Sequence, residues 1–102
     1  MKVLCWNVAG IRACLKRGSL DFLIDTEWDI VCFQETKAEE AQVPIPEPLA
    51  ELYPHRYWRS SLGVKQRKGL SGTAIWSRKP AIRELDSPAI DVEGRVTALE
   101  FK

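Results

Sequence analysis

Two short apolar runs, KVLCWNV (residues 2–8) and DIVCFQE (residues 29–35), constrain the fold of this chain more than any other feature. Both are rich in β-branched and aromatic residues, a composition typical of strands. Apolar residues occupy consecutive positions in the second run, as expected where both faces of a sheet are covered. The sequence between the runs has a helical pattern, so we predict a strand–helix–strand unit with parallel strands and a right-handed crossover.

The connecting sequence predicts two short helices. IRACLKR (residues 11–17) can form two helical turns, which Gly18 ends. Ser19 is a residue type that favours the N-cap position, and the LDFLIDTEW stretch after it carries an apolar pattern. The residues expected on the apolar side of this second helix are Leu20, Phe22, Leu23 and Ile24.

The remainder of the chain predicts further strands around a proline-rich stretch. VPIPEP (residues 43–48) holds three prolines, which we expect to exclude regular structure, and LAELYP (residues 49–54) can form a single helical turn. Strands are predicted within HRYWRSS (55–61), TAIWSR (73–78) and RVTALEF (95–101).

Length and charge indicate one globular domain over residues 1–102. Hydrophobic residues make up 45% of the chain and charged residues 28%, which excludes a disordered or fibrous chain. The formal net charge of +1 gives no argument for a polyanionic partner. Basic residues nevertheless cluster at 12–17 and 63–69 and acidic residues at 35–40 and 47–51, which indicates either a basic edge or ordinary solvated charge runs.

The cysteines predict a reducing environment. Cys5, Cys14 and Cys32 are odd in number and form no CxxC pair, and Cys5 and Cys32 lie in apolar runs where cysteine acts as a small hydrophobe. The sequence has neither an apolar stretch of about 18 residues nor the features of a signal peptide. We therefore expect a cytoplasmic protein that does not enter a membrane.

Asn7 and Glu35 stand near the ends of the two strands predicted to be parallel. Ligands collect beyond the carboxyl ends of such strands, and an amide beside a carboxylate makes an oxygen site suited to Mg²⁺. In the alternative interpretation, Asn7 caps the turn that follows it, and Glu35 caps a helix or points into solvent. Spacing alone leaves both interpretations open.

Other candidate residues favour structural roles. His55 follows Pro54 where a loop enters a strand, so we interpret it as a surface or turn residue rather than a general base. Aromatic residues among basic ones can stack on nucleobases. Trp6 and Trp76 lie within predicted strands, however, and core filling explains them better.

The order of the motifs resembles a known family. The segments KVLCWNVAGIRACLKRG, WDIVCFQETKAEEAQVP, KGLSGTAIWSRKP and EGRVTALEF are similar, in order and with short gaps, to the first part of the exonuclease III family of apurinic/apyrimidinic endonucleases, within the endonuclease/exonuclease/phosphatase superfamily. The resemblance implies an α/β fold in which this chain forms the N-terminal half of a four-layer, deoxyribonuclease-I-like sandwich, with a mixed sheet and helices on one face.

The resemblance also implies roles for individual residues. Glu35 matches the metal-binding carboxylate, and Asn7 matches a residue of the catalytic centre. Leu70 stands where the family usually has an aromatic residue. Leucine can still act as an apolar wedge toward a DNA groove, but a weaker one. The positions that match DNA-contacting or site-flanking residues of the family are Arg12, Lys16, Arg17, Lys37, Gly69, Leu70, Ser71 and Gly72.

The chain departs from the family pattern in two ways. Ala9 stands two positions after Asn7, where the family commonly has an acidic or amide residue, so a contact in the outer shell of the metal or to a second metal is expected to be lost. The family's later motifs, an aspartate with an asparagine two residues on and an aspartate–histidine pair, are also lacking, because Asn7 and His55 are the only asparagine and histidine.

From this resemblance we expect a relative of DNA-repair nucleases, dependent on Mg²⁺ or Mn²⁺, that acts on double-stranded DNA at abasic sites or 3′ ends, with weak or no hydrolysis. The alternative is a non-catalytic DNA-binding or dimerising module, or a fragment of a larger enzyme with no separate role. Half of a sandwich leaves one sheet face uncovered, so we also expect a homodimer through that face.

Overall fold

The predicted strand–helix–strand unit is present in the structure. Strand β1 (Val3–Asn7) runs parallel to strand β2 (Ile30–Gln34), in a register that pairs Val3 with Ile30 and Asn7 with Gln34. Helices α1 (Ile11–Lys16) and α2 (Phe22–Asp25) lie between them in the chain. This computed structural model of the chain describes residues 1–60, 71–86 and 94–102.

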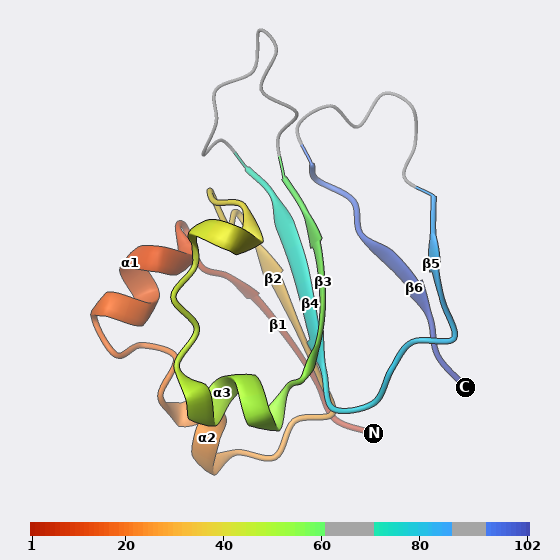
Figure 1. Cartoon of the computed structure of the whole chain (residues 1–102), viewed down its shortest axis with the longest axis horizontal. Coiled ribbons are helices and arrows are strands. Elements are labelled where there is room, and N and C mark those ends of the chain that lie inside the picture. The colour runs from red at the N-terminus through yellow and green to blue at the C-terminus, as the bar shows by residue number, and fades with distance from the viewer. Residues whose placement is uncertain (61–70, 87–93) are drawn as a thin grey trace, which may run out of the picture.

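The main sheet is mixed, as predicted. Strand β4 (Thr73–Ser77) pairs antiparallel with β2 and with β3 (His55–Arg59), which gives the order β1-β2-β4-β3. Strands β3 and β4 lie inside the stretches 55–61 and 73–78, where strands were predicted. Figure 1 shows the helices gathered on one face of this sheet.

Strands β5 (Arg83–Leu85) and β6 (Ala98–Glu100) form a second, antiparallel pair. Strand β6 lies within the predicted strand at 95–101, whereas nothing in the sequence predicted β5. Figure 1 shows the pair beside β3, and an ion pair between Arg59 on β3 and Glu84 on β5, 3.3 Å apart, joins it to the main sheet. The Tyr57 hydroxyl accepts a hydrogen bond from the Ala81 N–H at 2.8 Å, and the Thr73 and Thr97 hydroxyls lie 2.6 Å apart.

The hydrophobic core lies between the main sheet and the helices. Trp76 on β4 is completely buried, with its ring centroid 4.8 Å from that of Phe33 in an edge-to-face contact. The rings of Tyr53 and Trp58 pack on it at 6.4 and 6.5 Å. Trp6 also packs against this core from β1, so both strand tryptophans have the packing role expected from the sequence.

The second predicted helix is shorter than expected. It begins at Phe22 with Asp21 as its N-cap, and no side chain caps it, so the predicted Ser19 cap is wrong. Leu23 is its one buried residue, whereas Phe22 and Ile24 are about two-fifths exposed. A helix of a single turn can turn only one side toward the sheet, which leaves Phe22 and Ile24 partly exposed.

The proline-rich stretch is partly regular, which also corrects a prediction. A 3₁₀ turn, η1 (Glu40–Gln42), precedes it, and helix α3 (Glu47–Leu52) begins inside it with Pro48 in the first turn. Proline is tolerated there because the N–H groups of a first helical turn have no partner within the helix. The single turn predicted for residues 49–54 overlaps the last four residues of this helix.

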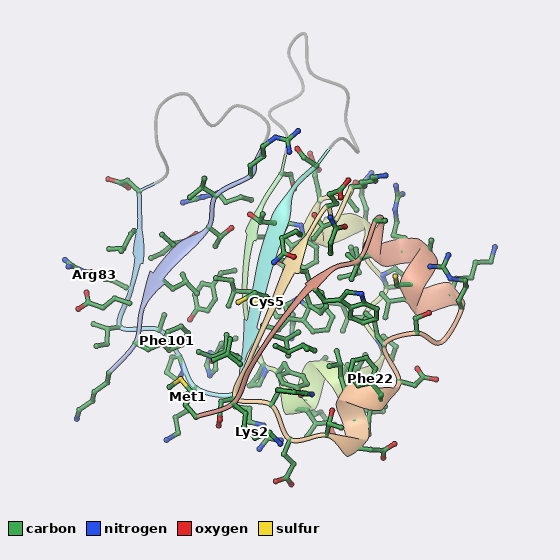
Figure 2. All side chains as sticks on the ribbon, turned by 180° about the vertical axis from the view of Figure 1, so that it is seen from behind. Met1, Lys2, Cys5, Phe22, Arg83 and Phe101 are labelled. Atoms are coloured by element: carbon green, nitrogen blue, oxygen red, sulfur yellow. The ribbon has the colours of Figure 1, made fainter. Side chains whose placement is uncertain are left out.

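The other face of the sheet is open along β1. Val3 is half exposed, and Cys5 is exposed rather than packed as the small hydrophobe expected from its apolar run. Figure 2 shows Cys5 on this side of the sheet. Its register partner Cys32 is half-buried, and burial, together with the neighbouring Cys5 thiol, raises the pKa of Cys32 to about 11. None of the helices in the described segments has the length and apolar character needed to span a membrane.

Candidate functional site

Asn7 and Glu35 meet at the carboxyl edge of the two parallel strands. The Asn7 Nδ2 group donates a hydrogen bond to Glu35 Oε2. Asn7 Oδ1 accepts a bond of 3.0 Å from the Ala9 N–H. Asn7 therefore does both things that the sequence left open, since it caps the turn after β1 and also adjoins the carboxylate. Glu35 is partly exposed.

Main-chain hydrogen bonds hold the Glu35 segment from two sides. On one side, the Gly10 N–H donates to the Glu35 carbonyl at 2.8 Å, and the Ile11 N–H donates to the carbonyl of residue 36 at 3.0 Å. On the other side, the N–H groups of residues 36 and 37 donate to the carbonyls of residues 72 and 71, at 3.1 and 2.7 Å. The carboxylate therefore projects from a turn that both neighbouring loops support.

The same loops contain unusual backbone conformations. The φ angles of Ala9, Glu35, Lys37 and Ser71 are +47°, +53°, +55° and +50°, and no other non-glycine residue of the described segments has a positive φ. Such angles are uncommon outside glycine and cost free energy, and they concentrate at functional sites. Their grouping around one carboxylate points to a functional site at this edge of the sheet.

A small cleft of about 200 Å³ opens beside the pair. Sequence reasoning missed three of its residues, Gln34, Thr73 and Arg95. Arg95 comes from the segment before β6, and the path of that segment brings it to the cleft. The residues lining the cleft are Asn7, Gln34, Glu35, Ser71, Gly72, Thr73 and Arg95.

The donor set of the cleft fits a hard divalent cation held by one carboxylate. Within the described segments, no group of three or more His, Cys, Asp or Glu side chains is placed to hold a metal. Mg²⁺ is commonly bound through one or two carboxylates, with water and phosphate oxygens in its other positions. Glu35 meets this minimum. Ala9 has no side-chain oxygen to offer, and its N–H is used by Asn7.

The basic residues predicted to contact DNA lie on α1 and next to the site. Arg12 and Lys16 line a groove of about 450 Å³ between α1 and residues 42–46. Arg12 Nη2 also donates to the Lys37 carbonyl at 3.4 Å, which links this groove to the Glu35 turn. Arg17 is exposed at the end of α1.

The remaining predicted residues lie at the two ends of the sheet or outside the described residues. Ser71 and Gly72 are at the site and buried, while Gly69, Leu70 and the basic cluster at 63–69 lie outside the described residues. His55 begins β3 and pairs with Ser77, at the end of β4 opposite Thr73. The histidine is therefore far along the sheet from the Asn7–Glu35 pair.

Comparison with known proteins gives a consistent family assignment. The family model described as the endonuclease/exonuclease/phosphatase family matches residues 4–101. The chain is 36% identical to the DNA repair nuclease APEX1 of Danio rerio, over 99% of this chain and 33% of that protein. It is 37% identical to an exodeoxyribonuclease of Bacillus subtilis, over 100% of this chain and 39% of that protein. The chain thus spans between a third and two-fifths of the length of these relatives.

Solved structures confirm the expected fold. A 3′ phosphatase NExo from Neisseria, bound to a product DNA hairpin, superposes with a TM-score of 0.74 at 25% identity, over 97% of this chain and 37% of that one. An AP endonuclease from Archaeoglobus fulgidus gives a TM-score of 0.66 at 29% identity, over 90% and 34%. The match is to the N-terminal part of a deoxyribonuclease-I-like fold. The chain belongs to the endonuclease/exonuclease/phosphatase family.

Proposed function

We propose that this chain carries a divalent-metal half-site for phosphodiester bonds in double-stranded DNA, at abasic sites or 3′ ends, and that it hydrolyses them slowly. The observation that carries the proposal is the contact between Asn7 and Glu35 at adjoining strand ends, in a family whose similar members include a DNA repair nuclease and an exodeoxyribonuclease. We expect this function in the cytoplasm.

Each residue has a defined task in this proposal. Glu35 holds Mg²⁺ or Mn²⁺, which supplies charge neutralisation at the phosphate and an activated water. Asn7 fixes the carboxylate through its amide and can turn a donor toward a phosphate oxygen. Four basic side chains hold the phosphates of the DNA backbone electrostatically, namely those of Arg12, Lys16, Arg17 and Lys37.

Slow turnover follows from the groups that the site does not contain. Among the described residues, Glu35 is the one carboxylate lining the cleft, and His55 lies at the other end of the sheet. General acid–base catalysis typically contributes about 10²- to 10⁴-fold to a rate. We therefore expect hydrolysis at least that far below the rate of the B. subtilis relative.

An assay on duplex DNA tests the proposal. With Mg²⁺, the chain should cleave abasic or 3′-recessed duplexes slowly, and a chelator should abolish cleavage. Binding should weaken about 100-fold between 50 and 200 mM salt, because about four basic side chains displace counterions. Cleavage at the rate of the full-length relative, or binding that ignores salt, would contradict the proposal.

A second candidate function is DNA binding without hydrolysis. The absence of a multi-residue metal cluster from the described segments favours it. Salt-sensitive binding that needs neither Mg²⁺ nor Glu35, with no cleavage over days, would identify this function. Cleavage that depends on both would exclude it.

The homodimer belongs to the same proposal, with a second copy of the chain covering the open sheet face. Val3 and Cys5 are exposed on that face, although the β5–β6 pair already contacts its β3–β4 side. Large apolar surfaces are rarely left in water. A twofold axis over β1 would bury the same residues of both copies.

Sedimentation of Val3→Glu tests this interface. The unmodified chain should sediment as a dimer at micromolar concentration, with Cys5 protected from alkylation, and Val3→Glu should give a folded monomer with a reactive Cys5, because the interface would bury an unpaired charge. Ile24→Glu, at an apolar residue of similar exposure on α2, is the matched control and should stay dimeric. A stable monomer of the unmodified chain would refute the dimer.

A further inference from the structure

Thr36 and Gly72 touch behind the Glu35 turn. The Thr36 side chain is completely buried, and its Oγ1 has no hydrogen-bond partner in the part of the chain that the structure describes. A methyl group added at Gly72 would lie 2.5 Å from that Oγ1, far inside van der Waals contact. The threonine hydroxyl thus fills the space that any larger residue at position 72 needs.

The main chain holds the same two residues together. The Thr36 N–H donates to the Gly72 carbonyl at 3.1 Å, and Gly72 has a φ of +92°, a conformation that favours glycine. Thr36 stands between Glu35 and Lys37, both in the left-handed region. A displacement of Thr36 therefore rotates the backbone from which the Glu35 carboxylate projects.

We propose that Thr36 and Gly72 are positioning residues, whose close approach aims the Glu35 carboxylate at Asn7 and the cleft. Thr36 is completely buried and does not line the cleft, and Gly72 lines it but has no side chain with which to bind the metal. The effect of this carboxylate orientation on metal binding rests on the proposed function. The orientation itself does not rest on it, so it can be measured in the metal-free protein.

Asn7 provides a direct readout of the Glu35 position. It is the only asparagine in the chain, and its side-chain amide donates to Glu35. In metal-free ¹⁵N NMR spectra, Glu35→Ala defines where the Asn7 amide resonances lie without this bond. Gly72→Ala should move the resonances toward that position, because the new methyl group pushes on Thr36.

A double variant separates positioning from general damage. Adding Thr36→Ala to Gly72→Ala removes the clashing oxygen and should return the Asn7 resonances toward their original position. Adding Thr36→Ser instead keeps the oxygen and should not. Gly18→Ala is the matched control, because Gly18 is also left-handed, with a φ of +74°, but lies at the end of α1. It should leave the Asn7 resonances unchanged.

Two results of these spectra would contradict the role of Thr36 and Gly72. Asn7 resonances unmoved by Gly72→Ala, or no return in the alanine double variant, would overturn the inference. If Gly72→Ala alone does not fold, a folded alanine double variant supports the inference and an unfolded one overturns it. Calorimetric titration with Mn²⁺ should then show about tenfold weaker affinity in Gly72→Ala. An unmodified chain that binds no Mn²⁺ would refute the proposed function, while the metal-free spectra still test the positioning.

Discussion

Glu35→Gln should remove divalent-metal binding from the chain. Glutamine keeps the size of the side chain and an oxygen, but lacks the negative charge that a hard cation requires. Glu35 is the one carboxylate that lines the cleft in the part of the chain the structure describes, so none of the described neighbours there can replace it. Partners outside the first coordination sphere control affinity about 10- to 100-fold, and the loss of a direct anionic ligand should exceed that range. Titration calorimetry with Mn²⁺ at neutral pH measures the change.

Two further variants set the scale of the Glu35 effect. Asn7→Ala removes the amide that donates to Glu35 and should weaken Mn²⁺ binding about 10- to 100-fold. Glu51→Gln removes the same charge from an exposed position on α3 and should leave binding unchanged. Equal Mn²⁺ affinity in Glu35→Gln and the unmodified chain would place the cation elsewhere.

Trp76→Ala should leave the chain only marginally stable. Trp76 is completely buried and contacts the rings of Phe33, Tyr53 and Trp58, so its truncation opens the centre of the core. Truncation of a buried tryptophan typically costs about 3–5 kcal/mol. Small domains have total stabilities near the lower end of about 5–15 kcal/mol. Urea unfolding followed by circular dichroism gives the change in the free energy of unfolding.

Trp76→Phe distinguishes packing from hydrogen bonding. The indole Nε1 of Trp76 is buried without a partner among the described residues. Phenylalanine removes this unsatisfied donor and keeps an aromatic ring, so the loss of stability should be well below that of Trp76→Ala. Ile24→Ala, at an exposed position, should change stability by less than about 0.5 kcal/mol. A Trp76→Ala chain as stable as the original would show that this core does not determine stability.

Sequence patterns predicted the part of the fold that depends on local periodicity. β1 and β2 could be placed, and their parallel arrangement inferred, because two apolar runs flank a helical segment. That arrangement brings Asn7 and Glu35 to one edge, as predicted, whereas their contact was one of two interpretations that the sequence left open. Their chemical roles remain predictions.

Features that depend on long-range contacts were not predictable in this way. Strand β5 consists of three exposed residues, and pairing with β6 alone defines it. The left-handed backbone at Glu35 has no local signal, because glutamate does not favour that conformation. Hydrogen bonds from the Gly10 N–H to the Glu35 carbonyl and from the Thr36 N–H to the Gly72 carbonyl hold the segment in place. Arg95 reaches the cleft for the same reason, through the path of a distant segment.

The position of β1 in the strand order has a consequence for handling this protein. Within the described residues, β1 pairs with β2 alone, so its other side presents unpaired amide and carbonyl groups. Such an exposed edge strand is a template for pairing with a strand of another molecule, and charged residues or proline usually prevent that pairing. Val3, Leu4, Cys5 and Trp6 supply neither. A concentrated sample can therefore polymerise sideways through backbone pairing, a route that a lysine at position 5 would obstruct.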